Sequence, residues 1–529
     1  MPIARTLGVA LTGLTGQIVE VQADLSAGLP GLTFTGLPDT SVVEARDRIR
    51  AAVLNSGSAW PNRRITLALL PADVRKAGSR FDLAMAIAIL AAAGRVAAEA
   101  IADVVWIAEL GLDGCLRSVR GVLPAMIAAR RAGVRRVVVP SANAAEAILV
   151  DAVDVRAADS LAQVLDWLQG AGPPLPAAQP GPEFPDDDRL PDLADIAGQS
   201  SAKRALEVSA AGGHNLYLVG AAGAGKSMLA ERLPGLLPAL EDDVALEVTG
   251  VHSVAGALPA GARLVRRPPW QAPHHTASAA ALVGGGSGIA SPGAISLAHG
   301  GVLFLDEAAE FSPAVLETLR QPIESGRIVL HRSGGAVCYP ARFLLVLAAN
   351  PCPCGQPARM CSCPSVVRRR YQQRLSGPLL DRVDLRVTVE PVPHADLFGE
   401  VDERETSATV AMRVARARAA AAERWSTSGW RLNGQVPGGA LRHSPWRLPR
   451  AALCQAEMYL DRGQLSVRGF DRVLRMAWTV SDLQGRAVPD PVMLPRPCSS
   501  VSAGTSHGRR DRPSTADRWA PRRSRRGGR

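Results

Sequence analysis

A glycine-rich segment with one lysine constrains the fold of this chain more than any other feature. Residues 215–227 read NLYLVGAAGAGKS, in which an apolar strand pattern runs into the spacing G-x-x-x-x-G-K-S. Glycines let backbone N–H groups turn toward phosphate oxygens, the lysine holds the terminal phosphates, and the serine hydroxyl can bind Mg²⁺. Only three of the 60 basic residues are Lys, and a chance match at this spacing is well under ~1%. The predicted nucleotide-binding residues are Gly220, Gly223, Ala224, Gly225, Lys226, Ser227 and Met228.

An acidic motif follows the glycine-rich segment by some 80 residues. GVLFLDEA (301–308) is an apolar strand pattern that ends in two carboxylates. Phosphoryl transfer needs one carboxylate near Mg²⁺ and another that orients the attacking water. We therefore expect Asp306 to lie in the Mg²⁺ coordination shell and Glu307 to orient the attacking water. This pair favours hydrolysis of the nucleotide over binding alone. A solvated acidic strand end is the alternative.

Hydrophobic patterning divides the chain into five parts. Residues 1–169 alternate strand-like and helix-like runs, and the Pro- and Gly-rich stretch 170–191 is typical of a linker. Continuous apolar runs between helices predict a parallel sheet wrapped by helices over 192–392. Residues 393–485 show only helical patterns, and 486–529 have no period and are expected to be disordered. Expected strands are 64–72, 134–140, 215–220, 301–307, 342–350 and 383–389. Expected helices include 81–94, 122–133 and the helical pattern MLAERLPGLL (228–237).

Composition excludes several classes of protein. The chain is 47% hydrophobic and 21% charged, which is ordinary for a folded protein. No apolar run reaches the roughly 18 residues of a membrane helix, and no signal peptide is apparent, so we expect a soluble, cytoplasmic protein with no membrane partner. The net charge of +11 suggests a nucleic-acid partner, but residues 500–529 hold nine Arg and two Asp. The rest of the chain is only weakly basic. The basic tail is consistent with electrostatic binding of nucleic acid, but a solvated tail is the commoner case.

Four of the eight cysteines fall within twelve residues. In a cytosolic chain, two close thiol pairs favour a tetrahedral zinc site over a disulfide framework. The C-x-C spacing is tighter than the usual C-x₂-C, and a loop of reduced cysteines is the alternative. The candidate zinc ligands are Cys352, Cys354, Cys361 and Cys363.

Taken together, these motifs resemble AAA+ ATPases, specifically the magnesium-chelatase-like ComM/YifB family of DNA-associated motors. The resemblance covers residues 1 to about 485 and departs at Ala294, where the family more often has Glu, and after SDLQGR, where a final helix would be expected. It implies ATP and Mg²⁺ as cofactors and a homohexameric ring. The matching segments are GLPGLTFTGLPDTSVVEARDRIRAAVLNSG (28–57), DIAGQSSAKRALEVSAAGGHNLYLVGAAGAGKSMLA (195–230), WQAPHHTASAAALVGGG (270–286), PGAISLAHGGVLFLDEAAEF (292–311), LAANPCPCG (347–355) and SGPLLDRVDLRV (376–387).

The resemblance also assigns roles to single residues. Asn350 matches the sensor that contacts the γ-phosphate or water, and Arg382 matches the arginine finger that enters the neighbouring subunit's site. Arg468 matches the second sensor, with Arg472 as the weaker choice. A surface arginine is the ordinary reading of each Arg, so motif position alone supports these assignments.

The front domain, 1–169, resembles the Lon protease domain but lacks its Ser/Lys dyad. Arg80 stands where the nucleophilic Ser would fall, Ser79 is adjacent, and GVLPAM (121–126) supplies no Lys. We therefore expect a docking or DNA-clamping module and no peptidase.

An insertion at 252–300 is the candidate DNA-binding element. The resembling family has a hairpin and helix here that face the ring's central channel, and a basic loop can grip a phosphate backbone. Arg266 and Arg267 are the proposed DNA contacts, beside Arg263; His274 and His275 suit a turn or polar core better than a metal. The leading hypothesis is a DNA helicase or branch-migration motor in recombination or natural transformation. The alternatives are a chelatase motor that drives metal insertion into a porphyrin and, less favoured, an ATP-dependent protease.

Overall fold

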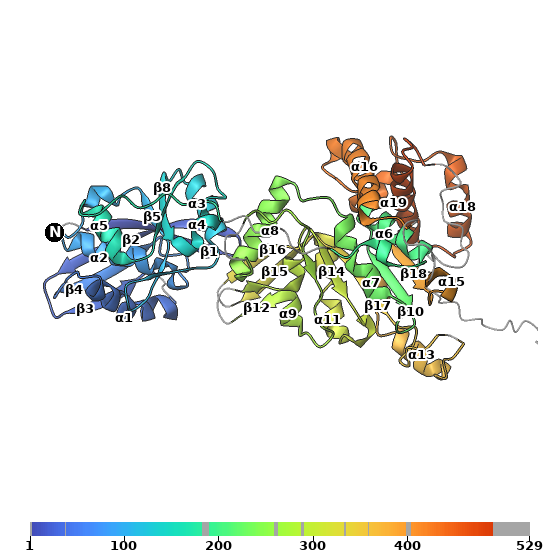
Figure 1. The fold of residues 1–529 in the computed structure, drawn as a ribbon, viewed down its shortest axis with the longest axis horizontal. Helices are drawn as coiled ribbons and strands as arrows, with labels where there is room; N and C mark the ends of the chain where they lie inside the picture. The colour runs from blue at the N-terminus through green and yellow to red at the C-terminus, as the bar shows by residue number, and fades with distance from the viewer. Residues whose placement is uncertain are drawn as a thin grey trace, which may run out of the picture.

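Two separate β-sheets organise the chain. The structure is a computed structural model, and it describes residues 3–36, 39–181, 190–258, 263–286, 290–332, 335–357, 359–397 and 404–489. The domain that contains the first sheet lies at one end of an elongated molecule, and the helices of the C-terminal part lie at the other end (Figure 1). Of the tail predicted at 486–529, only 486–489 fall within the described residues.

The front domain is built on a mixed seven-stranded sheet. Strands β1 and β2 pair antiparallel over nine residues, and β2 pairs antiparallel with β4, while the remaining neighbours are parallel. Helix α2 (Asp82–Ala92) is buried from Asp82 to Ala91, as its unbroken apolar sequence predicts. The strands, in sheet order, are β3 (Gly31–Thr35), β4 (Arg64–Leu70), β2 (Thr15–Ser26), β1 (Ala4–Thr12), β5 (Val104–Trp106), β8 (Arg136–Pro140) and β9 (Asp154–Ala158). The other main helices are α1 (Thr40–Asn55), α3 (Val122–Arg131), α4 (Ala144–Ala147) and α5 (Leu161–Leu168).

Part of the predicted linker packs on the edge of this sheet. Leu175 is buried, the Ala157 N–H donates to the Pro176 carbonyl at 3.0 Å, and the Ala178 N–H donates to Val155 at 3.0 Å. These residues therefore extend the β9 edge, and the described chain continues at Leu190.

The second sheet has five strands, all parallel, as the continuous apolar runs predicted. Each of the six buried residues of β17 is apolar. Strand β10 lies between β17 and β18, and β14 lies on the other side of β17, so these carboxyl ends meet at one edge of the sheet. The order is β11 (Trp270–Gln271), β14 (Val302–Leu305), β17 (Leu344–Ala349), β10 (Leu216–Gly220) and β18 (Leu385–Val389).

Helix α7 (Lys226–Glu231) is shorter than its sequence pattern suggested. The helical pattern MLAERLPGLL continues to Leu237, but the chain turns at Arg232 into a 3₁₀ segment, Leu233–Leu236. Pro234 lacks the N–H that an α-helix would need there, which accounts for the early end.

A helical domain completes the described chain. Buried Val410, Val414, Ala417, Ala421 and Trp425 follow the helical period along α16 (Ser407–Trp425) and pack toward α19 (Val467–Leu483). Helices α16 and α19 also pack on α6 (Ser200–Gly212) of the sheet domain. The shorter helices of this domain are α17 (Gly438–Leu441) and α18 (Arg450–Asp461).

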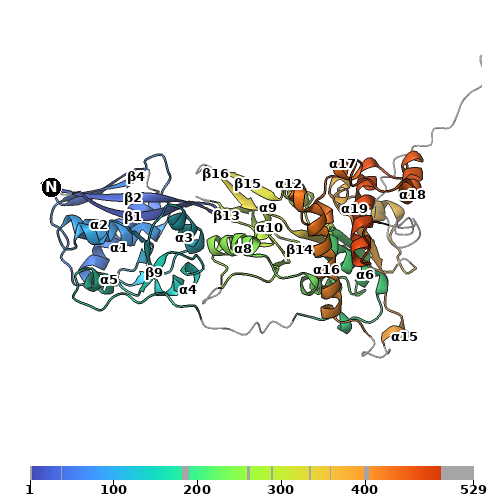
Figure 2. The ribbon, with the colours of Figure 1, turned by 90° about the horizontal axis from the view of Figure 1, so that it is seen from above.

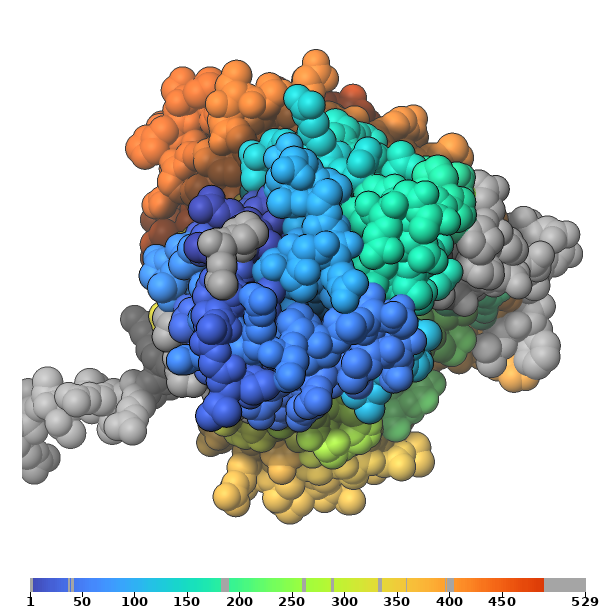
Figure 3. Space-filling model, turned by 90° about the vertical axis from the view of Figure 1, so that its left-hand side faces the viewer, coloured from blue at the N-terminus to red at the C-terminus, as the bar shows by residue number. Residues whose placement is uncertain are grey.

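The front domain docks on the sheet domain through two helices. Helix α3 packs against α8 (Asp242–Ala255), as two perpendicular views show (Figures 1 and 2). The Gly121 N–H donates to the Ser253 carbonyl at 3.1 Å, and the Ser253 hydroxyl donates to Glu146. Seen along the long axis, the front domain forms the near end of the molecule (Figure 3).

Within the described residues, we find no helix with the length and apolar character needed to cross a bilayer.

Candidate functional site

The carboxyl ends of β10, β14 and β17 bring the predicted nucleotide-binding residues together. Gly220 ends β10 and begins the glycine-rich loop, Asp306 directly follows β14, and Asn350 directly follows β17. Because these strands are parallel neighbours, side chains far apart in sequence converge on one edge of the sheet.

The Lys226 ammonium lies at the centre of this cluster. Its Nζ donates to the carbonyl oxygens of Gly220 at 2.9 Å and Ala221 at 2.8 Å, and to Asn350 Oδ1 at 3.0 Å. Burial lowers the pKa of Lys226 from its ordinary value, while Asp306 and Glu307 oppose that shift. A buried cation whose hydrogen-bond partners are neutral oxygens suits an anionic ligand such as a triphosphate.

Ser227 and Asp306 form the second contact. The Ser227 hydroxyl donates to Asp306 Oδ2 at 2.6 Å, and the Glu307 N–H donates to Asp306 Oδ1 at 2.8 Å. Hydroxyl and carboxylate oxygens are the ligands that Mg²⁺ prefers. The pair therefore fits the proposed Mg²⁺ site.

The glycine-rich loop has a backbone that favours glycine at two positions. Gly223 has φ +74° and Gly225 has φ +90°, which an L side chain rarely adopts. Between them, Ala224 is buried and its carbonyl accepts from Gln199 Nε2 at 3.3 Å. Met228 is 48% exposed on α7, so it can border a ligand but contributes no core packing.

Gln199 is a residue that the sequence analysis did not single out. It begins α6 with φ +57°, and its Nε2 also donates to the Glu390 carbonyl at 2.6 Å. Gln199 therefore joins the glycine-rich loop (220–227), the expected phosphate loop, to the end of β18. Its adjacent glycine, Gly198, was the only local signal of an unusual turn.

Glu307 is in a strained backbone conformation. Its φ of +49° is rare for a residue with a side chain, and strain of this kind often accompanies functional sites. The carboxylate is half exposed, and its Oε2 lies 3.1 Å from His275 Nδ1. His274 instead contacts the Thr276 hydroxyl at 2.8 Å, which is the turn role expected for it. His275 therefore holds the side chain that is expected to orient water.

The three arginines assigned by resemblance lie in different surroundings. Arg382 is largely buried and pairs with Glu324 on α12 (Arg320–Ser325). Arg468 is exposed in the first turn of α19. Arg472, one turn later, is buried, and its Nη1 donates to the Val383 carbonyl at 2.8 Å. No contact joins any of them to Lys226 among the described residues, so their roles remain predictions.

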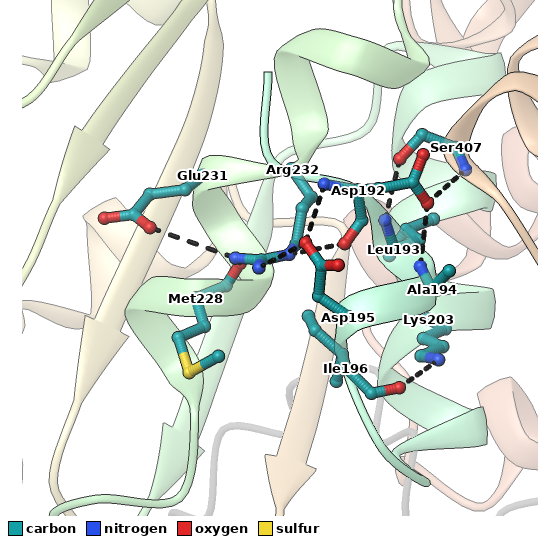
Figure 4. A network of polar contacts seen from close by, with 10 residues as sticks. All are labelled: Asp192, Leu193, Ala194, Asp195, Ile196, Lys203, Met228, Glu231, Arg232 and Ser407. Carbon is teal, nitrogen blue, oxygen red and sulfur yellow. Dashed lines mark hydrogen bonds and ion pairs between the residues drawn. The ribbon is translucent and has the colours of Figure 1, made fainter. Parts of the chain in front are cut away.

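A polar network around Arg232 connects the phosphate loop to the helical domain (Figure 4). Arg232 is buried, and its Nη1 donates to the Met228 carbonyl at 2.8 Å while Nε donates to the Asp192 carbonyl at 2.9 Å. The Asp192 carboxylate accepts from the Ser407 N–H at 2.9 Å. A displacement of α7 can therefore reach the first turn of α16. The sequence offered no signal for this network beyond one arginine among many.

The four clustered cysteines lie beside the same site. Their Sγ atoms all lie within 4.8 Å of one another, with Cys352 3.1 Å from Cys354 and 3.4 Å from Cys361. Four thiolates around tetrahedral zinc at about 2.3 Å would be about 3.8 Å apart. The four thiols, Cys363 included, are therefore close enough to hold one metal ion.

In the front domain, Ser79 and Arg80 occupy the position where the resemblance to Lon would place a nucleophile. The Ser79 hydroxyl donates to Glu109, and Arg80 Nη2 donates to the Arg120 carbonyl at 3.1 Å. These contacts give Ser79 a carboxylate partner in place of a lysine base.

The candidate DNA-binding loop borders α8. Arg266 Nη1 pairs with Asp242 Oδ1 at 2.8 Å, and both side chains are more than half exposed. Exposed pairs of this kind contribute little energy, so Arg266 can exchange Asp242 for a phosphate at small cost. Residues 259–262 and 287–289 of this insertion lie outside the described residues.

Models of magnesium chelatase match most of the chain. The model for magnesium chelatase subunit ChlI matches residues 192–397, a second ChlI model matches 21–143, and a C-terminal ChlI model matches 404–495. An uncharacterized protein of Mycobacterium tuberculosis is 52% identical over 494 residues, which are 92% of this chain and 96% of that protein.

Two further relatives also span almost the whole chain. The competence protein ComM of Haemophilus influenzae is 41% identical over 492 residues, covering 92% of this chain and 94% of ComM. The uncharacterized protein YifB of Escherichia coli is 41% identical over 476 residues, covering 90% and 92%. Partial matches are Lon protease of Mycolicibacterium smegmatis (30% over 170 residues, 30% of this chain and 21% of Lon) and the magnesium-chelatase 38 kDa subunit of Cereibacter sphaeroides (25% over 195 residues, 37% and 51%).

These matches confirm the predicted family and fold class: an α/β chain with a Lon-like front domain and a parallel-sheet AAA+ core. The chain belongs to the magnesium-chelatase-like ComM/YifB family of AAA+ ATPases.

Proposed function

We propose that this protein is a ring-forming ATPase that moves along or remodels DNA, as a helicase or in branch migration during recombination or natural transformation. The observation that carries the motor is the convergence of Lys226, Asp306 and Asn350 at one sheet edge. The observation that favours DNA is the likeness to a competence protein over 92% of the chain. We further propose that it works in the cytoplasm, where ATP and DNA are both present.

The family implies ATP and Mg²⁺, and the residues at the sheet edge fit both. Bound Mg²⁺ would neutralise phosphate charge, with Ser227 and Asp306 as its protein ligands. Lys226 exchanges its carbonyl partners for phosphate oxygens. Asn350 then orients either the phosphate or water, and Glu307 accepts a proton from water once it is aligned.

A homohexamer would complete each site. Arg382 would reach the neighbouring subunit's nucleotide. Arginine suits this role because its planar, permanently charged guanidinium contacts two phosphate oxygens at once. To do so it must leave Glu324, whose side chain is 58% exposed. We propose Arg468 as the second sensor, since its exposed position at the start of α19 leaves it able to turn toward a ligand.

The DNA contact is proposed at Arg266 and Arg267. The matched test replaces both with Ala and compares the double variant with Arg130→Ala/Arg131→Ala, which removes two exposed charges from α3. We expect the loop variant to lose stimulation of ATP hydrolysis by forked DNA and the α3 variant to keep it. Unchanged DNA affinity in the loop variant rejects this contact.

A chelatase-type motor is the second candidate, because a chelatase subunit is 25% identical over part of the chain. That likeness covers only 37% of the chain. The discriminating experiment measures ATP hydrolysis with forked DNA and with a porphyrin-binding partner. Stimulation by forked DNA supports the DNA motor, and stimulation by the porphyrin-binding partner alone supports the chelatase.

We propose that the front domain is a docking or DNA-clamping module and that it does not cleave peptides. The pairing of Ser79 with Glu109 and the docking of α3 on α8 support this role. Casein hydrolysis that disappears in a Ser79→Ala variant would contradict it.

The four cysteines are proposed to bind one structural zinc ion. Their close approach and soft thiolate chemistry support this assignment. Metal analysis of the purified full chain is expected to give one zinc per chain.

A further inference from the structure

We infer that the metal ion held by the four clustered cysteines fixes the phosphate loop in its nucleotide-binding form, so that metal occupancy controls ATP affinity. The inference rests on the proposed ATP site and zinc ion, and it adds a means of regulating that site.

The first link between the two sites is the strand end at Asn350. Asn350 accepts a hydrogen bond from Lys226, and Cys352 follows it by only two residues. Cys352 is 1% exposed, whereas Cys354 is exposed. Cys352, the most buried candidate ligand, is therefore only two residues from Asn350. The position of Cys352 limits where Asn350 can lie.

The second link is a backbone hydrogen bond into the phosphate loop itself. The Ala222 N–H donates to the Gly355 carbonyl at 2.8 Å, and the Gly355 N–H donates to the Cys352 carbonyl at 3.1 Å. Ala222 belongs to the glycine-rich loop, and Gly355 directly follows Cys354. The turn that carries two ligands thus provides an acceptor for the loop.

The turn and the loop approach each other closely at Gly355, whose backbone conformation favours glycine. Gly355 has φ +66°, and a Cβ added there would lie 3.3 Å from the Ala222 Cβ and 3.6 Å from Asn350 Nδ2. The positive φ strains any side chain at this position, and its Cβ would crowd Ala222 while making only an ordinary contact with Asn350. Gly355 is therefore the point at which the cysteine turn contacts the site.

A metal ion is what keeps this turn in place. Cys361 and Cys363 join it from the segment that leads into α13 (Ser365–Gln372), so metal binding adds a tie between the two cysteine pairs to the hydrogen bond from Gln372 Nε2 to the Pro351 carbonyl at 3.3 Å. Structural zinc contributes folding free energy to such loops. Without it, the Gly355 carbonyl is free to leave Ala222, and Asn350 is free to leave Lys226.

The experiment uses the full chain, purified under reducing conditions. Zinc is quantified, removed with a chelator and then restored in equimolar amount, and the affinity for a fluorescent ATP analogue is measured at each stage. We expect affinity to fall about fivefold or more on zinc removal, as the loss of at least one hydrogen bond predicts, and to recover on zinc addition. Thermal unfolding of the chelated chain checks that it remains folded.

Two variants separate the metal from its contact. Gly355→Ala keeps all four ligands, so it should retain one zinc per chain and still bind nucleotide several-fold more weakly. Cys363→Ser should lose zinc and nucleotide affinity together. Cys454→Ser is the matched control, because Cys454 is an exposed cysteine on α18 outside the cluster, and it should change neither property.

Each contrary result points to a different error. If chelated protein and Gly355→Ala both bind the analogue as well as the wild type, the coupling is wrong and the ATP site stands. If the chain carries no zinc, or if its four thiols form disulfides, both the zinc assignment and the coupling fail. If zinc-loaded wild type does not bind the analogue, the proposed motor itself fails.

Discussion

Replacing Ser253 by Ala should weaken the contact between α3 of the front domain and α8 of the sheet domain, which we call the joint. Ser253 and Glu146 are both buried, and the serine hydroxyl donates across the joint to the carboxylate. A hydrogen bond to a charged group contributes about 1.5–3 kcal/mol, and about 1.4 kcal/mol corresponds to a factor of ten. Glu146 keeps its bond from the Leu123 N–H at 2.8 Å. Joint opening should therefore increase roughly 10- to 100-fold.

Hydrogen exchange of the Gly121 amide measures this opening directly, because that N–H donates to the Ser253 carbonyl across the joint. Burial raises the pKa of Glu146, so the measurement is made at about pH 8 to ensure ionisation. Ser253→Ala is expected to speed hydrogen exchange of the Gly121 amide roughly 10- to 100-fold.

The control for this prediction is Ser209→Ala. Ser209 is also buried, and its hydroxyl donates to the His214 carbonyl at 2.7 Å inside the ATPase domain. It should lower the overall stability while leaving Gly121 exchange close to that of the wild type. Gly121 exchange in Ser253→Ala within about twofold of the wild type would refute the reasoning, since even the weakest such bond predicts more.

Three further predictions concern the nucleotide site. Glu307→Gln should bind ATP but slow its hydrolysis roughly 10²- to 10⁴-fold, measured by single-turnover hydrolysis beside a binding titration; an unchanged rate contradicts the role of Glu307. Burial lowers the pKa of Lys226 in the free protein, and a bound phosphate would raise it. Nucleotide affinity should therefore be constant at low pH and fall as pH rises through the lowered pKa. A binding titration from about pH 7 to about pH 10 checks this, and affinity that rises with pH contradicts it. Arg382→Ala should keep ATP affinity and lose about 10³-fold in hydrolysis, and mixing it with Lys226→Ala should restore activity; no gain on mixing argues against a finger supplied in trans.

The local sequence was sufficient to predict where the strands that form the site end. Continuous apolar runs marked β10, β14 and β17, and polar residues directly after them had to share an edge once the strands were parallel. That rule accounts for Asp306 and Asn350, and the glycine-rich motif after β10 accounts for Lys226 beside them.

Contacts set by the path of a loop had no such rule. The contact between His275 and Glu307 depends on where the insertion folds back, and periodicity does not predict that path. The same holds for the bond from Ser253 to Glu146, which joins two domains. Helix α7 was expected to be longer because its apolar spacing continues, yet Pro234 interrupts its hydrogen bonding.

A different case is the hairpin of β15 (Arg327–Arg332) and β16 (Gly335–Pro340). Strand-like runs on both sides of the sequence SGG (333–335) were visible and would have predicted it.

ATP hydrolysis by purified Lys226→Ala protein tests the central claim most directly. The account predicts that removing the ammonium that contacts Gly220, Ala221 and Asn350 abolishes both tight nucleotide binding and turnover, while the thermal unfolding midpoint stays near that of the wild type. Turnover at the wild-type rate in that variant would contradict the claim that this sheet edge is where ATP is cleaved.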